Sequence, residues 1–205
     1  KEELASLAEV FKKNPHVFIM SDEIYEHIVF EGKHESIAQF DFLKDSIIII
    51  NGLSKGFAMT GWRLGYLAAP LFIAKAADKL QGQFTSATCS ITQRAGIAAL
   101  TGDLKPTYDM VAEFRLRRKI VLQLIHDIPG LLCSEPTGAF YVFPDVHFYF
   151  GKKTPDNVII NNADDLIMYL LNVAHVSTVS GNAFGEPNCI RLSFANSVAN
   201  LEKGF

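Results

Sequence analysis

The chain has 205 residues and a mass of 22.7 kDa, the size of one or two domains. Lys and Arg together number 19 against 22 Asp and Glu, so the net charge is −3. This near-balance argues against a nucleic-acid or membrane-surface partner, either of which would need clustered cationic residues. No apolar run reaches the length needed to span a bilayer. The hydrophobic fraction of 49% indicates a folded globular protein.

The N-terminus and the cysteines bear on the cellular compartment. No apolar segment follows the basic start at Lys1, so the sequence gives no indication of a secretory signal. The cysteines are odd in number and far apart, which disfavours a disulfide framework or a cysteine-based zinc site. The six histidines lack metal-ligand spacing, and we expect no metal site. These features together predict a cytoplasmic protein.

Apolar spacing predicts alternating helices and strands in the first half of the chain. Residues 2–13 carry apolar side chains at 3,4 spacing, which predicts an amphipathic helix that Pro15 stops. The run from Ser46 to Ile50 has no polar face and is typical of a central strand in a parallel sheet with helices on both sides. Further buried strands are expected over 17–20 and 64–69, and helices around 72–81 and 91–100.

The second half of the chain has a different pattern of predicted helices and strands. Pro106 suits the first residue of a long helix that continues to His126 and ends at Pro129-Gly130. Short strands over 138–143, 175–179 and 189–194 then accompany a helix over 163–172 and a last helical turn over 200–205. We therefore predict an α/β unit with a mostly parallel sheet over residues 1–112 and a smaller α+β unit over residues 113–205.

The densest cluster of chemically active residues spans Asn51 to Gly65 and directly follows the apolar run at 46–50. It places Lys55 at the carboxyl end of a predicted parallel strand, where ligand sites of α/β proteins form. Partial burial would favour the neutral amine, which is the nucleophilic form of a lysine. Arg63 offers a planar fork suited to phosphate. The ordinary alternative is that Lys55 is a solvated loop lysine.

A second cluster, Ser21-Asp22-Glu23-Ile24-Tyr25, also follows an apolar strand. Asp22 could pair with a cationic ring nitrogen, and Tyr25 could hydrogen-bond a phenolate-type oxygen. The ordinary alternative is a helix N-cap at Ser21 or Asp22, followed by a half-buried tyrosine.

Taken together, these clusters resemble the fold type I pyridoxal-phosphate enzymes, class I/II aminotransferases, and most closely the bacterial aspartate and aromatic branch. The run from Ser54 to Gly65 is similar to the lysine signature of that family, and the segment 21–25 is similar to the motif that precedes it. Three later segments, 135–144, 180–185 and 190–195, resemble the entry to the small domain and the C-terminal motifs. Five matches in the right order cover nearly the whole chain.

The resemblance implies roles for the residues around pyridoxal 5'-phosphate. Lys55 matches the lysine that forms the aldimine with the cofactor and later moves the α-proton. Asp22 matches the carboxylate that keeps the pyridine nitrogen protonated, which makes the ring an electron sink. Tyr25 matches the residue bonded to the 3-oxygen of the ring.

The resemblance also implies the phosphate and substrate contacts. Arg63 matches the phosphate-binding arginine, and Ser54 adds a hydroxyl to the same group. The family often has a second hydroxyl three residues before the lysine, where this chain has Gly52. Arg191 matches the arginine that binds the substrate α-carboxylate, a bidentate pairing that fixes orientation. Phe184 is expected to line the substrate pocket.

The resemblance covers only the C-terminal half of a typical family member. It implies that residues 1–112 form the C-terminal part of the cofactor-binding large domain. Residues 113–205 correspond to the small domain, with its last helix truncated. A full-length parent would be a homodimer, because the active site of the family lies between subunits. The isolated piece is expected to bind the cofactor weakly and to expose apolar faces and open sheet edges.

Three functions remain open from the sequence. The leading one is amino-group transfer between an amino acid, with aspartate favoured, and a 2-oxo acid, with 2-oxoglutarate favoured. The second is another reaction on the same scaffold, such as β-elimination catalysed by a β-lyase, because the lysine, aspartate, tyrosine and arginine are shared. The third is an inactive fragment with a structural or assembly role only.

Overall fold

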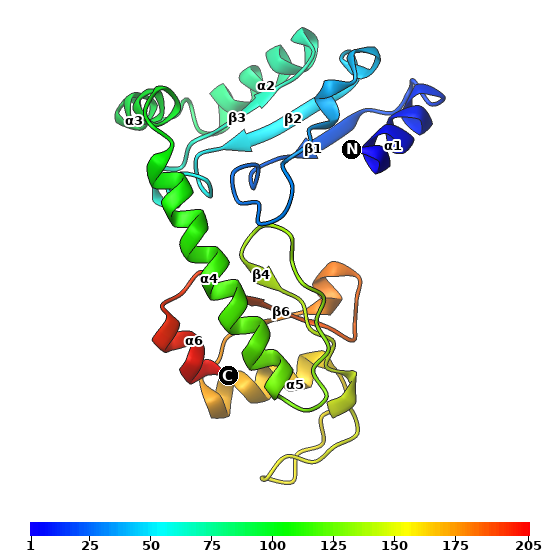
Figure 1. The fold of residues 1–205 in the computed structure, drawn as a ribbon. Helices are drawn as coiled ribbons and strands as arrows, with labels where there is room; N and C mark the ends of the chain where they lie inside the picture. Colours follow the sequence, from blue (N-terminus) through cyan, green and yellow to red (C-terminus); the bar gives the residue numbers. More distant parts are fainter. The chain divides into compact units, whose positions relative to one another are not determined.

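The computed structural model describes residues 1–205, which divide into two compact units, Lys1–Asp109 and Met110–Phe205 (Figure 1). The division falls inside one long helix, α4 (Lys105–Asp127). No helix combines the length and the apolar composition that a membrane span requires. Each unit has its own sheet and is described separately.

The first unit is built on a three-stranded sheet in the order β1-β2-β3 (Figure 1). Strand β1 (Ile19–Asp22) runs parallel to β2 (Ile47–Gly52), and β3 (Gly65–Ala68) pairs antiparallel with β2. The prediction of a mostly parallel sheet is therefore wrong for β3. The loop between β2 and β3 contains no crossover helix that could carry the chain back to the starting edge, so the next strand returns antiparallel.

One face of this sheet carries the core of the unit. Helix α1 (Glu2–Lys12) confirms the predicted helix and buries Ala8 completely. Ala8 joins Ile37, Leu43 and Ile47 in an apolar cluster, and Ile19 and Ile49 pack against it. Since Ile19 pairs with Ile47 and side chains alternate along a strand, Ile19, Ile47 and Ile49 share one face of the sheet. Packing on the α1 side accounts for Ile47 and Ile49, whereas Ile48 and Ile50 point to the opposite face.

The opposite face is poorly covered, in contrast to the helices expected on both sides. Met20 exposes 71% of its surface there. Helix α2 (Leu71–Phe84) contains no buried residue, and α3 (Ser90–Thr101) buries only Thr92 and Gly96. Large apolar side chains of the two helices are exposed, namely Leu71, Phe72, Leu80, Phe84, Ile91, Ile97 and Leu100. The expectation of uncovered apolar surface is confirmed.

The second unit has a small antiparallel sheet in the order β4-β6-β5, formed by β4 (Tyr141–Val142), β6 (Ile190–Ser193) and β5 (Val179–Ser180). Helix α5 (Ala163–Tyr169) packs on it through a cluster that includes Val146, Leu166 and Ile190. The chain ends in α6 (Val198–Gly204), which begins two residues before the predicted last turn because Ser197 caps it.

The segment after α5 differs from the prediction. The chain continues as a π-helical turn over Leu170–Ala174, and His175 takes a left-handed conformation with φ of 58°. The strand expected over 175–179 is therefore wrong, and β5 begins only at Val179. The helix ends because a residue with positive φ breaks the repeating backbone geometry.

Candidate functional site

The carboxyl ends of β1 and β2 lie side by side in the first unit. Asp22 pairs with Ile50 in the parallel register, and the amide of Glu23 donates to the Ile50 carbonyl over 2.8 Å. The exposed Asp22 carboxylate accepts a bond of 3.2 Å from the amide of Ile24. Since parallel strands end at the same edge, the segment after β1 and the loop after β2 meet here, as the sequence predicts.

The loop after β2 closes on itself and presents Lys55. The amide of Leu53 donates to the Leu64 carbonyl over 3.1 Å, and the amide of Ala58 donates to the Lys55 carbonyl over 3.2 Å. Lys55 is half-buried, and its Nζ lies 5.9 Å from the ring centroid of Tyr25. That distance is within cation–π range. The structure therefore brings together the amine and the phenol ring predicted from separate motifs.

The backbone leaves no room for a side chain at Gly52. A Cβ atom there would lie 2.8 Å from the Leu64 carbonyl oxygen and 3.0 Å from the Cα of Gly65. The amide of Gly52 donates to Asn51 Oδ1 over 2.7 Å, which holds the strand end in this position. Local packing therefore excludes from this position the hydroxyl side chain that the family named in the sequence analysis often has three residues before its lysine.

Arg63 closes the loop in a left-handed conformation with φ of 56°. Its side chain is exposed, and one of its terminal nitrogens donates to the Thr60 carbonyl over 2.9 Å. A guanidinium has five N–H donors, so this bond leaves it able to bind an anion as well. Ser54, which precedes Lys55, is half-buried in the same loop.

Two contacts that the sequence did not reveal hold the backbone next to Lys55. The buried hydroxyl of Thr107 donates to the Gly56 carbonyl over 2.9 Å. A Cβ atom at Gly56 would lie 2.6 Å from Cδ2 of His27, and His27 stacks edge-on against Phe57 at 5.4 Å. Thr107 lies 51 positions from Gly56, so no local sequence signal could have linked the two residues.

A buried carboxylate lies between the two predicted cofactor residues of the first motif. Glu23 is 7% exposed and accepts hydrogen bonds from Ser21, His34 and Ser36. Burial raises the pKa of Glu23, but these bonds and the charge of His34 outweigh that effect, and the pKa lies below its ordinary value. The sequence motif contained Glu23 but suggested no role for it.

The second unit places two aromatic rings against Arg191. The centre of its guanidinium lies 4.5 Å from the ring centroid of Tyr141 and 4.5 Å from that of Phe184. Phe143 meets Phe184 edge-on at 5.8 Å. Both distances are within cation–π range, and the N–H donors of a guanidinium suit a planar carboxylate. The structure thus brings together the predicted residues Arg191 and Phe184.

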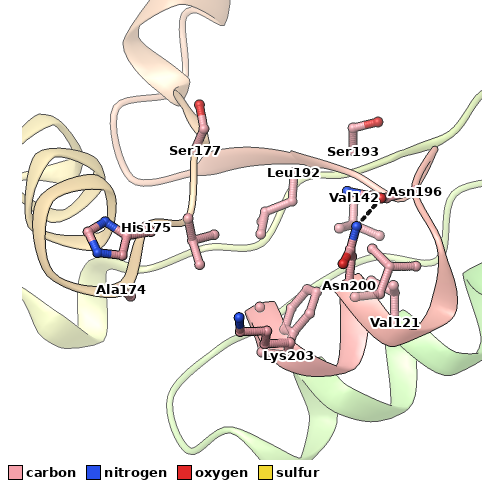
Figure 2. Close-up of a pocket in the computed structure, with 14 residues that line it drawn as sticks. Val121, Val142, Ala174, His175, Ser177, Leu192, Ser193, Asn196, Asn200 and Lys203 are labelled. Atoms are coloured by element: carbon pink, nitrogen blue, oxygen red, sulfur yellow. Dashed lines mark hydrogen bonds between the residues drawn. The ribbon is translucent and has the colours of Figure 1, made fainter.

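The second unit also contains a pocket of about 480 Å³, and Figure 2 shows the residues around it. Leu192 and Val142 form part of its apolar lining, and Asn200 donates to Asn196 over 2.9 Å at its wall. None of the predicted site residues lines it. Arg191 and Leu192 are neighbours in β6 and so point to opposite faces of the sheet, which separates this pocket from Arg191.

The site residues thus form two groups, one in each unit. The first group offers an amine, a phenol, a carboxylate, a hydroxyl and a guanidinium, provided by Lys55, Tyr25, Asp22, Ser54 and Arg63. The second offers the guanidinium of Arg191 beside two aromatic rings. The first group could hold a molecule with an anionic group and an electrophilic carbon, and the second could hold a carboxylate.

The chain resembles known proteins along almost its whole length. The sequence profile described as aminotransferase class I and II matches residues 1–204. A bifunctional aspartate aminotransferase and glutamate/aspartate-prephenate aminotransferase of Petunia hybrida is 43% identical, covering 97% of this chain and 42% of its own length. A probable aspartate/prephenate aminotransferase of Rickettsia bellii is 41% identical, covering 98% of this chain and 51% of its own length.

Solved structures give the same picture. The aspartate aminotransferase of Rhizobium meliloti matches with a TM-score of 0.92 and 40% identity over 97% of this chain and 50% of that one. An aromatic aminotransferase of Pyrococcus horikoshii matches with a TM-score of 0.89 and 32% identity over 100% of this chain and 53% of that one. The chain therefore spans about half the length of the relatives it matches.

Proposed function

This chain belongs to the aminotransferase class I and II family, and we propose that the protein transfers an amino group between an amino acid and a 2-oxo acid. The observation that carries the proposal is the meeting of Lys55 and Tyr25 at the carboxyl edge of the sheet, 5.9 Å apart from Nζ to ring centroid. Asp22 ends the neighbouring strand at the same edge. An amine, a phenol and a carboxylate there suit one aromatic aldehyde cofactor.

Members of this family generally use pyridoxal 5'-phosphate, and the residues present fit that cofactor. Its aldehyde requires an amine, its ring oxygen a hydrogen-bond donor, its ring nitrogen a carboxylate and its phosphate cationic and hydroxyl donors. Lys55, Tyr25, Asp22, Arg63 and Ser54 supply these groups in turn. Because the backbone at Gly52 leaves no room for a side chain, one hydroxyl contact to the phosphate is absent, while the contacts from Arg63 and Ser54 remain.

Each residue has a defined task in this proposal. Arg63 and Ser54 bind the phosphate, Tyr25 donates to the ring oxygen, and Asp22 holds the proton on the ring nitrogen. Lys55 Nζ would take the proton from the α-carbon of the amino acid. In the reverse half of the reaction it would return a proton to the α-carbon of the 2-oxo acid acceptor. When bound, the cofactor spreads the negative charge that develops on that carbon into its ring.

Arg191 binds the α-carboxylate of the substrate in this scheme. A bidentate guanidinium–carboxylate pair fixes the orientation of the amino acid and leaves its amino group directed at the cofactor. The contacts of Arg191 with the rings of Tyr141 and Phe184 support this role, because a guanidinium restricted before binding loses less freedom when it binds.

The names of the relatives support the choice of substrates. They describe aspartate and aspartate/prephenate aminotransferases, so we propose aspartate as the amino donor and 2-oxoglutarate as the principal acceptor. Prephenate, which is itself a 2-oxo acid, is the second acceptor to test. We further propose that residues 1–112 belong to the large domain, that residues 113–205 form the small domain and that the full-length protein is a homodimer.

Cofactor trapping tests the proposal on the 205-residue chain. The chain is incubated with pyridoxal 5'-phosphate, reduced with borohydride and digested, and the modified lysine is located by mass spectrometry. Lys55 should carry the label, Lys55→Ala should abolish it, and Lys44→Ala, which changes an exposed lysine at the far end of β2, should leave it unchanged. Labelling spread over surface lysines would contradict the assignment.

Turnover tests the reaction type in the longer protein. Loss of aspartate should depend on added 2-oxoglutarate and should produce glutamate. Release of ammonia from an amino acid without any oxo-acid acceptor would instead identify an elimination reaction.

A further inference from the structure

Glu23 is an acidic residue buried beside the proposed cofactor site, and the proposed reaction does not use it. It exposes only 7% of its surface, whereas the neighbouring Asp22 is exposed. Burying an ionised carboxylate is costly unless hydrogen bonds and opposite charge compensate it. The presence of Glu23 at this position therefore requires an explanation from its contacts.

The contacts of Glu23 tie three segments of the first unit together. Its Oε1 accepts from Ser21 over 3.1 Å and from Ser36 over 2.7 Å, and its Oε2 accepts from His34 Nε2 over 2.9 Å. Ser36 in turn caps the short 3₁₀ helix over Ile37–Gln39. Ile37 is part of the apolar cluster under α1. The carboxylate thus links the end of β1 to a loop that is itself anchored in the core.

The backbone of Glu23 belongs to the turn that presents Asp22 and Tyr25. Its amide donates to the Ile50 carbonyl over 2.8 Å, and its carbonyl accepts from the amide of Glu26 over 2.9 Å. A rotation of this peptide unit would move the side chains of Asp22 and Tyr25 together. The three side-chain bonds of Glu23 oppose that rotation from the buried side of the turn.

We propose that Glu23 is a positioning residue whose buried carboxylate, held by Ser21, His34 and Ser36, fixes the turn that directs Asp22 and Tyr25 at the cofactor. The roles of Asp22 and Tyr25 in this statement rest on the function proposed above. The anchoring of the turn by Glu23 does not, and the two parts are tested separately.

Hydrogen exchange measured by mass spectrometry tests the anchor without any cofactor. Glu23→Ala should raise exchange over residues 22–30 by at least about tenfold, the effect of losing hydrogen bonds to a charged group. Exchange in α3 and in the second unit should not change. Glu3→Ala, in exposed α1 sequence, is the matched control. Unchanged exchange over 22–30, or an equal rise across the whole first unit, would overturn the proposal.

Two further variants separate positioning from a general loss of structure. Glu23→Gln keeps the length of the side chain. The carbonyl oxygen of the glutamine side chain can accept from both serines, and its NH₂ group can donate to His34, whose ring accepts in one neutral tautomer. Its exchange over 22–30 should stay within about threefold of wild type, because hydrogen bonds are replaced and not lost. His34→Ala removes one contact only and should give a smaller local rise, which keeps the test decisive if Glu23→Ala does not fold.

Cofactor titration tests the second part. In the wild-type chain the absorbance change on adding pyridoxal 5'-phosphate gives its affinity, and borohydride trapping identifies Lys55. Glu23→Ala should weaken that affinity by at least about tenfold, and Glu23→Gln should restore most of it. Unchanged affinity in Glu23→Ala would overturn the link to the cofactor. If wild type traps no cofactor on Lys55, the proposed function fails for this chain, and the exchange result alone decides whether Glu23 anchors the turn.

Discussion

Replacing Gly52 by alanine tests whether backbone packing shapes the loop that carries Lys55. The new Cβ would lie 2.8 Å from the Leu64 carbonyl oxygen and 3.0 Å from the Cα of Gly65. Both neighbours are backbone atoms, one in the first residue of β3 and one in the residue before it. Neither can move aside as a flexible side chain would. Overpacking of this kind costs about 1–3 kcal/mol.

Urea unfolding of the first unit measures that cost. Trp62, the only tryptophan, lies in the loop that connects β2 to β3, so its fluorescence reports on the unfolding of this unit. With a urea dependence of about 1–3 kcal/mol per molar, the Gly52→Ala midpoint should fall by roughly 1 M. Gly82→Ala is the matched control, because a Cβ at Gly82 in α2 meets nothing within 4 Å, and its midpoint should hold or rise. Equal midpoints for the two variants would refute the packing argument.

Variants at Thr107, Glu23 and Arg191 test three further contacts. Thr107→Val keeps the side-chain shape but leaves the Gly56 carbonyl without its buried donor, so unfolding stability should drop by about 1–3 kcal/mol while Thr107→Ser retains most of it. Because its pKa is lowered, ionised Glu23 stabilises the folded state at pH values above its ordinary pKa of 4.5. This contribution is lost as the pH falls through the lowered pKa. The urea midpoint of wild type should therefore decrease more than that of Glu23→Gln between about pH 6 and about pH 3. Arg191→Lys should raise the KM for aspartate in the longer enzyme at least about tenfold, since a lysine cannot form the bidentate pair, and an unchanged KM would argue against Arg191 as the carboxylate ligand.

The sequence was a good guide wherever one segment carried its own signal. The apolar run at 46–50 and the 3,4 spacing of residues 2–13 predict β2 (Ile47–Gly52) and α1 (Glu2–Lys12) to within two residues at each end. Lys55 and Asp22 were assigned to strand ends for the same reason, because polar residues directly after an apolar strand must lie at its edge. These features depend on side-chain periodicity, which a linear sequence contains in full.

Local spacing failed where the outcome depended on distant partners. The antiparallel direction of β3 follows from the path of the loop across the sheet and not from the composition of the strand. The π-helical turn over 170–174 and the left-handed His175 depend on how the end of α5 packs. Neither has a residue signature such as a glycine or a proline at the critical position.

The sequence alone determined the family, the strand-and-helix pattern of the first unit and the candidate residues Asp22, Tyr25, Lys55, Arg63 and Arg191, because motifs and periodicity are properties of neighbouring residues. Only the tertiary structure decided which groups meet. It placed Arg191 against the rings of Tyr141 and Phe184, closed the space beside Gly52 and buried Glu23 against His34. The physical reason is that hydrogen bonding, stacking and steric exclusion act over a few ångströms in space, and folding alone brings residues far apart in sequence within that range.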